Sequence, residues 1–220
     1  RPPGGGRRGR ARAYRAPLYS RACQPPAVAA QRPSSFDGWY IVEWAKWVLE
    51  NGLPDLPGFV GVDQAVPVAY WRTGDWAAVL NLQYVAPDPP VNVGPSLESE
   101  LLRFRAAAPG WEMSDGSGGS GWSDDVVLAR PPDLGPQDVV TTGSGLSARP
   151  GWACRTLNGR AGTDATTVEV RQYGRRLRQH IDSTIGAWVA AFDGSAPASV
   201  SVLAGDTVLF ARDLRPPPDL

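Results

Sequence analysis

Residues 166–213 read TTVEVRQYGRRLRQHIDSTIGAWVAAFDGSAPASVSVLAGDTVLFARD. This stretch is a succession of short apolar runs separated by turn residues. Turns are expected at Tyr173-Gly174, Asp193-Gly194 and Gly205-Asp206, where glycine or a small polar residue interrupts the apolar pattern. Short strands with a turn signal about every 8–12 residues are typical of antiparallel β-sandwiches and barrels. With one strand upstream, the expected strands are Trp152–Leu157, Thr166–Tyr173, Arg175–Asp182, Gly186–Phe192, Ala198–Leu203 and Thr207–Asp213. The sequence therefore predicts a C-terminal antiparallel β-sandwich over residues 151–215.

An amphipathic helix is predicted over residues 36–50, beginning after Ser34-Ser35. Helical spacing gathers one apolar stripe and leaves the charged residues on the opposite face. The stripe consists of Phe36, Tyr40, Trp44, Trp47 and Val48. Asn51-Gly52 supplies the signal that ends the helix.

Antiparallel strands are expected to follow the helix. Val66–Arg72 and Asp75–Val85 are joined at Thr73-Gly74, and the second segment alternates apolar and polar side chains. Residues 97–107 have both helical and strand spacing, and we favour a strand that forms a hairpin with the segment from Trp111. These elements predict a helix packed on an antiparallel sheet over residues 36–130, so the fold class is α+β.

Two segments rich in small residues are expected to be irregular. Ser114–Asp125 is dominated by Gly and Ser and is interpreted as a flexible loop. Residues 131–150 are rich in Pro, Gly and Thr and are interpreted as a linker between the two modules.

The zero net charge conceals an asymmetry between the ends of the chain. Residues 1–36 contain eight arginines and no acidic residue, whereas the remaining 184 residues contain 14 basic and 22 acidic ones. Residues 1–35 are also rich in Pro and Gly, so we expect a disordered tail. The acidic body is a poor partner for nucleic acid, which leaves the arginine-rich tail as the one segment suited to a polyanion.

No run of about 20 apolar residues suggests a membrane span, and the basic N-terminus lacks the apolar core of a signal peptide. The two cysteines, Cys23 and Cys154, lie far apart, and free thiols are expected. These features favour a cytoplasmic protein without membrane association.

The motifs that would indicate catalysis or ligand binding are incomplete. The glycines of residues 115–121 are followed by Asp124 and Asp125 in place of the Lys and Ser or Thr of a phosphate-binding loop, and the acidic residues do not have EF-hand spacing. His180 is the single histidine and is expected to point outward from its strand, with Leu177, Gln179 and Ile181 inward. We expect Cys154 to be a buried thiol, because no neighbouring base is indicated. We therefore predict no catalytic residues, no cofactor and no metal.

Nine tryptophans make aromatic residues the candidates for binding. Trp39 lies towards the polar face of the predicted helix, and Trp71 is expected on the strand face opposite Val68 and Tyr70. We take Trp39, Trp71 and Trp76 as candidate binding residues, since tryptophan is favoured at protein interfaces. Core packing is the alternative role for each of them.

A second candidate surface is basic. Arg171, Arg175, Arg176 and Arg178 lie on one predicted hairpin and could contact an acidic partner. Charge that protects a solvated edge strand from aggregation is the alternative explanation.

Two stretches resemble known families. Trp152–Val170, with its Gly159-x-x-Gly162 turn and V-x-V strand, continues through the apolar residues 186–191 to a final hairpin over 198–212. It resembles, over about 60 residues, the uncharacterised C-terminal β-modules of many actinobacterial proteins. The aromatic helix and meander upstream are similar in outline to the cone-shaped α+β fold of nuclear transport factor two and the polyketide cyclases. These resemblances imply a fold, and members of the second group include enzymes, binders and scaffolds alike.

The sequence thus favours a non-enzymatic pair of modules that binds a protein partner or a second copy of itself. The alternative is a small-ligand binder or enzyme that uses an aromatic-walled pocket in the first module, with an Asp as base. A concave cavity around a buried carboxylate would favour the alternative.

Overall fold

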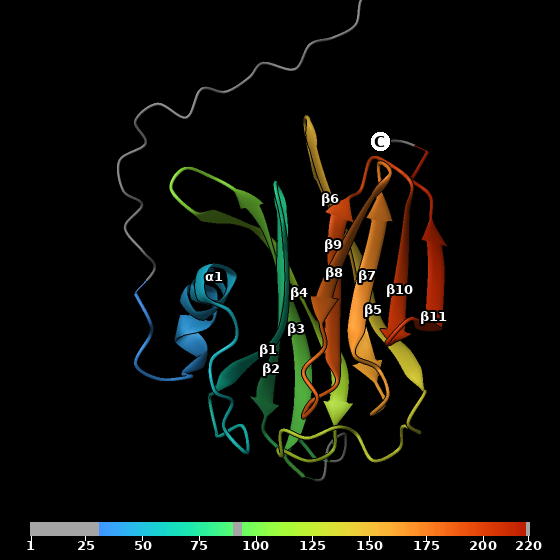
Figure 1. Ribbon diagram of the computed structural model, residues 1–220. Helices are drawn as coiled ribbons and strands as arrows, with labels where there is room; N and C mark the ends of the chain where they lie inside the picture. The colour runs from blue at the N-terminus through green and yellow to red at the C-terminus, as the bar shows by residue number, and fades with distance from the viewer. Residues whose placement is uncertain (1–30, 90–93, 219–220) are drawn as a thin grey trace, which may run out of the picture.

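The computed structural model describes residues 31–89 and 94–218 and is built almost entirely of antiparallel strands (Figure 1). A 3-10 turn, η1 (Gly38–Tyr40), leads into the helix α1 (Ile41–Asn51). The strands that follow are β1 (Ala65–Thr73), β2 (Trp76–Val85), β3 (Ser96–Ala106), β4 (Trp111–Ser123), β5 (Val139–Arg149), β6 (Trp152–Ala161), β7 (Thr167–Gln172), β8 (Arg175–His180), β9 (Ala187–Asp193), β10 (Ala198–Ala204) and β11 (Thr207–Leu214). No helix in the described ranges has the length and apolar character needed to cross a membrane.

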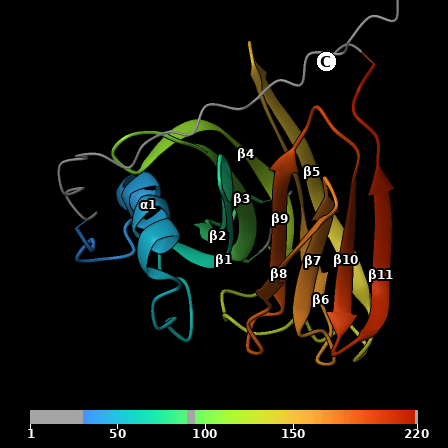
Figure 2. The ribbon, with the colours of Figure 1, turned by 45° about the horizontal axis from the view of Figure 1, so that its top comes forward.

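The strands form three sheets, and every pair within them is antiparallel. Their orders are β1-β2-β3-β4, β5-β6-β9 and β11-β10-β7-β8. Helix α1 covers one face of the β1–β4 sheet, and strands β5–β11 lie on its other side, as Figures 1 and 2 show from two directions. The first sheet is therefore covered on both faces.

The predicted helix is confirmed, although it begins later than expected. Asp37, rather than Ser34 or Ser35, accepts a hydrogen bond from the Trp39 amide (3.0 Å) and starts the 3-10 turn that precedes α1. Gly52, with a φ of 90°, ends the helix in a conformation that glycine adopts without strain.

Residues 31–35 run along the helix, whereas residues 1–30 of the predicted disordered tail lie outside the described residues, together with Cys23. The Ser35 carbonyl accepts a hydrogen bond from Trp44 Nε1 (2.5 Å). The Arg32 guanidinium lies over the rings of Trp44 and Trp47, at 5.8 and 5.5 Å from their centroids. The ordered chain thus starts before the predicted boundary at residue 36.

Residues 97–107 are a strand, as we favoured, but the loop prediction for Ser114–Asp125 is wrong. Strand β4 continues through the Gly/Ser run to Ser123 and pairs with β3 along its length, with three irregularities in register. A Cβ added at Gly116 would come within 3.0 Å of a Leu102 methyl group. Because the neighbouring strand comes this close, glycine at this position allows the pairing instead of signalling a loop.

The linker prediction is also wrong for residues 139–149, which form strand β5 and pair with β6. Its small residues make room for polar side chains beneath the strand. A Cβ at Gly145 would overlap the Arg103 guanidinium, and one at Gly143 would lie 2.8 Å from Asn158 Oδ1. The composition therefore serves close packing, which local sequence signals do not distinguish from a loop.

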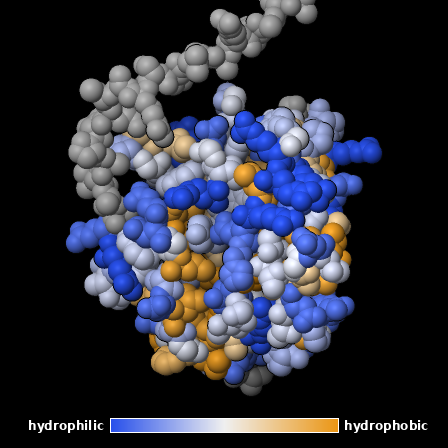
Figure 3. All heavy atoms as spheres, viewed as in Figure 1, coloured by the Kyte–Doolittle hydropathy of each residue, from blue (hydrophilic) through white to orange (hydrophobic). Residues whose placement is uncertain are grey.

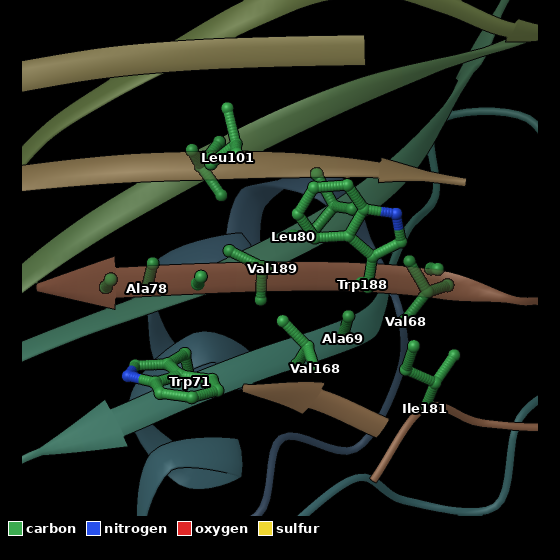
Figure 4. Packing of buried hydrophobic residues seen from close by; sticks show 14 of the residues in the cluster. Val68, Ala69, Trp71, Ala78, Leu80, Leu101, Val168, Ile181, Trp188 and Val189 are labelled. Carbon is green, nitrogen blue, oxygen red and sulfur yellow. The ribbon is translucent and has the colours of Figure 1, made fainter. Parts of the chain in front are cut away.

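The hydrophobic core is continuous across the boundary predicted between residues 36–130 and 151–215. One cluster of buried side chains joins the inner face of β1 and β2 with β9 and with the inner face of β7 and β10. Figure 4 shows Trp71, Leu80, Trp188 and Val189 among the side chains of this cluster. A smaller cluster lies between α1 and the opposite face of the first sheet.

Candidate interaction surfaces

The three predicted binding tryptophans do not lie together. Trp39 is 89% exposed, whereas Trp71 is 1% exposed and Trp76 is partly buried against the same core cluster as Trp71. Strand β1 is buried on both faces, with Tyr70 towards α1 and Trp71 towards β9. The strand face that we expected to be available at Trp71 is therefore core, because β9 covers it.

A hydrophobic surface surrounds Trp39, and backbone contacts between distant segments assemble it. The Gly38 amide donates to the Asp63 carbonyl (2.7 Å), and Phe59 forms an isolated bridge with Val127. These contacts bring together the segments that carry the exposed side chains of Trp39, Tyr40, Phe59, Val62 and Val127, which we call the Trp39 surface. Figure 3 shows hydrophobic side chains gathered below helix α1, on the side where the segment between α1 and β1 lies.

Cys154 is buried, as predicted, and its surroundings oppose a nucleophilic role. Burial is the main reason that the pKa of the thiol is raised to about 12, with Arg103 acting in the opposite direction. His180 is exposed and Ile181 is buried, as predicted. Leu177, which we expected to point into the core, is 42% exposed. In the described part of the chain, no group of three or more His, Cys, Asp or Glu side chains is arranged to hold a metal ion.

A buried arginine connects the first sheet with the second. Arg103, on β3, donates from Nε to Thr156 Oγ1 (2.9 Å), from Nη1 to Asp115 Oδ1 (3.0 Å) and from Nη2 to Ser117 Oγ (3.0 Å). Its side chain is 4% exposed, and β5 passes over it at Gly145. All three guanidinium nitrogens are thus bonded within the protein, so this cluster serves the structure.

The strongest concentration of charge is on the β7–β8 hairpin, as the sequence indicated. Arg171, Arg176 and Arg178 point to one face of the hairpin and surround Glu169, whose side chain is 0% exposed. Glu169 accepts from Arg171 Nε (2.5 Å) and from Arg178 Nε (2.6 Å), and Arg176 Nε lies 3.4 Å from the same carboxylate. We call these three arginines, with Arg175 at the turn, the arginine surface.

Glu169 stays ionised because of its partners. Burial alone would raise its pKa, but hydrogen bonds from Arg178 and Arg171 and the charges of Arg171 and Arg176 bring the pKa below its ordinary value. Each guanidinium approaches Glu169 through Nε, and Arg178 also has Nη1 at 4.0 Å from Asp206 Oδ1. One buried carboxylate thus orients three exposed cations.

The arginine surface borders a hollow of about 540 Å³ beside the hairpin turn. Its polar lining comes from Arg171, Gln172, Tyr173, Arg175, Arg176, Ser199, Asp213 and Arg215. The turn itself is anchored by Tyr173, whose hydroxyl donates to Asp193 Oδ2 (2.5 Å). Positive charge outweighs negative charge in this hollow, so its chemistry suits an anion.

We expect Glu169→Gln to lower the free energy of unfolding at pH 7 by about 2 kcal/mol, because charge-assisted hydrogen bonds become neutral ones and the arginines repel each other. The folded-state pKa of Glu169 is below its unfolded value, so its contribution is present above the unfolded pKa and is lost as the pH falls through the folded one. Urea unfolding of the protein and the variant from pH 7 to pH 3 should show the difference shrinking with acidity. A difference that stayed constant over this range would contradict the assignment.

A second hollow, of about 910 Å³, lies where the ends of β3 and β4 meet β6. The Arg160 guanidinium lies 5.9 Å from the Trp122 ring centroid and donates to the Trp122 carbonyl (2.9 Å). Three aspartates, Asp124, Asp125 and Asp133, also line the hollow. Aromatic, cationic and acidic groups therefore converge here.

Sequence reasoning missed the role of Glu169, although a signal for it was available. A two-residue turn at Tyr173-Gly174 fixes the register of the hairpin, which pairs Glu169 with Arg178 and Arg171 with Arg176. Cross-strand neighbours on one face of a sheet interact directly. The carboxylate at the centre of the arginines thus follows from turn length and alternation.

Comparison with known proteins found no match for this chain among family models, curated proteins or solved structures.

Proposed function

We propose that this protein is a non-enzymatic binding protein whose arginine surface takes an acidic segment of a protein partner. The observation that carries the proposal is the arrangement of three exposed arginines around the fully buried Glu169. Because Glu169 contacts each of them through Nε, the guanidinium groups are held in place before any partner arrives, and less side-chain freedom is lost on binding. Guanidinium groups held in this way match carboxylates, with which they form charge-assisted hydrogen bonds.

An acidic protein segment fits this surface better than nucleic acid does. Outside residues 1–36, acidic residues outnumber basic ones by 22 to 14, and a long phosphate backbone would meet this negative charge. The arginine surface itself is flanked by Asp206, 4.0 Å from Arg178, and by Asp213 in the hollow. The positive area is thus short, which suits a few carboxylates.

The Trp39 surface gives the proposal a second support. Trp39, Phe59 and Val62 are large apolar side chains that are exposed on segments joined by backbone contacts, far in sequence from the arginine surface. Contiguous exposed apolar side chains are typical of protein interaction sites, and tryptophan often dominates their binding energy. Of the three candidate binding residues, Trp39 is the one that is accessible to a partner.

The test is the binding of a fluorescein-labelled peptide rich in Glu and Asp, followed by fluorescence anisotropy at low ionic strength. We expect the double variant Arg176→Glu/Arg178→Glu to bind about 100-fold more weakly, because two charge-assisted contacts of about 1.4 kcal/mol each are lost. Binding should also weaken as salt is added.

The matched control is Arg212→Glu, an exposed arginine on the edge strand β11 of the same sheet. Its register partner Val200 is buried, so it belongs to the other face of the sheet and the variant should bind like the unchanged protein. The peptide in which Gln and Asn replace the acids should not bind. If the double variant and the control bound the acidic peptide equally well, the proposal would be wrong.

The alternative is a small-ligand binder that uses the hollow beside Trp122. The observation in its favour is the convergence of Trp122, Arg160 and three aspartates on one cavity of about 910 Å³. A small molecule that stabilised the protein against heat, with no effect of the β8 variants and a loss of stabilisation in Arg160→Met, would favour this function over peptide binding.

We also infer that the two C-terminal sheets form the predicted β-sandwich, which is supported by the core cluster that they share. The resemblance to the actinobacterial β-modules, and that of the helix and first sheet to the cone-shaped α+β fold, stay predictions. A helix covering one face of a four-stranded antiparallel sheet is in keeping with the second resemblance.

A further inference from the structure

Strand β8 lies at the edge of its sheet, and its free backbone groups can be assigned to particular residues. In the described part of the chain it pairs with β7 alone. Tyr173 and Gly174 have φ values of 54° and 70°, as in a two-residue hairpin turn of type I′. In such a hairpin the pair that flanks the turn, Gln172–Arg175, is joined by backbone hydrogen bonds. Along the hairpin, pairs joined in this way then alternate with pairs that are not.

This alternation places the outward backbone groups at Arg176, Arg178 and His180. The phase is checked at the far end of the hairpin, where the Ile181 amide donates to the Thr166 carbonyl (2.9 Å). Residues 179 and 177, which lie two and four positions before Ile181, therefore also direct their backbone N–H and C=O groups to β7. The N–H and C=O groups of the three intervening residues point away from the sheet.

These three residues carry ionisable side chains on one face of the edge, and Arg175, the fourth cationic residue of β8, lies on the other face. Arg176 and Arg178 lie on the Glu169 face, and the alternation of side chains along a strand puts His180 on that face as well. Leu177, 42% exposed, belongs to the opposite face, opposite Val170 in register. The free edge is thus basic on one face, and on the other face the apolar Leu177 lies between Arg175 and Gln179.

A partner strand must complement both faces. An added antiparallel strand would place the residues bonded to Arg176 and Arg178 on the arginine side, where carboxylates are favoured. The residue between them would lie beside Leu177, where an apolar side chain is favoured. A second copy of β8 is excluded as the partner by the same geometry, because it would set arginine against arginine.

We propose that the acidic partner binds as an additional antiparallel strand on β8, with acidic residues at every second position and apolar residues between them. The inference rests on the proposed function and specifies the class of segment and its backbone contacts. The six residues of β8 limit the paired segment to about 20 Å.

The experiment uses the whole protein and a labelled peptide of alternating Glu and Val, with two N-methylated forms of it. Methyl groups on the Glu amides block the hydrogen bonds to β8, whereas methyl groups on the Val amides face away from it. We expect the first form to bind at least tenfold more weakly, on the order of two lost backbone hydrogen bonds, and the second to bind about as well as the parent. Both forms have the same composition and charge, so electrostatic attraction cannot separate them.

Amide hydrogen exchange gives a second measurement on the protein itself. Binding of the unmethylated peptide should slow exchange at Arg176, Arg178 and His180, whose amides point outward in the free protein. If the peptide bound and depended on Arg176 and Arg178, but the two methylated forms bound alike and these amides stayed unprotected, strand addition would be overturned and the proposed function would stand. If no acidic peptide bound, both would fall.

Discussion

Trp71→Ala should lower the free energy of unfolding by about 4 kcal/mol, which makes it one of the two most damaging substitutions that we expect in this protein. Trp71 is 1% exposed and lies in the core cluster between the first sheet and β9 (Figure 4). Removing the indole withdraws a large apolar surface from the core and leaves a cavity that strands packed on both sides cannot fill. Urea or thermal unfolding followed by circular dichroism measures the loss.

Trp39→Ala is the matched control, since it removes the same side chain from a position that is 89% exposed. Its stability should change by no more than about 0.5 kcal/mol. Trp71→Phe should cost less than Trp71→Ala, because it leaves a smaller cavity and removes an indole N–H that has no hydrogen-bond partner among the described residues. Equal losses for Trp71→Ala and Trp39→Ala would show that Trp71 is not in the core.

Asp115→Ala should destabilise the protein by about 3 kcal/mol, because it leaves the buried Arg103 without its counter-charge. Asp115 is the one carboxylate in the described chain that forms an ion pair with Arg103, at 3.0 Å. The side chain of Arg103 is 4% exposed, but that of Asp115 is 38% exposed, so water reaches part of the vacated position and the loss falls at the lower end of the range for breaking a buried pair. The contact between the first and second sheets should weaken in particular.

Reactivity of Cys154 reports that weakening, because this thiol is buried near the Arg103–Asp115 pair. Labelling of Cys154 under native conditions should be faster in Asp115→Ala than in the protein with Asp115, and stability in urea should be lower. Both proteins carry Cys23→Ser, so that Cys154 is the one thiol available for labelling. The control is Asp133→Ala. Its carboxylate lies 3.8 Å from Arg160, and the side chain of Asp133 is 65% exposed. Surface pairs of this kind contribute about 0–1 kcal/mol. If the two variants were equally stable, Arg103 would not depend on Asp115 for its charge balance.

The candidate site was partly accessible from sequence. The basic hairpin was identified from its four arginines, and its register follows from the two-residue turn at Tyr173-Gly174. An edge position for β8 was the alternative explanation of these arginines, and the pairing of β7 with β10 on its other side decided it. The exposed Leu177 is the result, because no strand lies beyond β8 to cover it within the described chain.

Local pattern alone determined helix α1 and the six C-terminal strands, since helical spacing, strand alternation and turn residues are properties of neighbouring positions. Tertiary structure decided the rest. The Gly/Ser run of β4 and the Thr/Gly run of β5 are strands because they pair with β3 and β6, and glycines in them leave room for Leu102 and Arg103. Trp71 and Trp39 carry the same side chain, and only the arrival of β9 from more than a hundred residues away buries the first and leaves the second at the surface. Burial depends on which distant elements meet, and no short window of sequence contains that information.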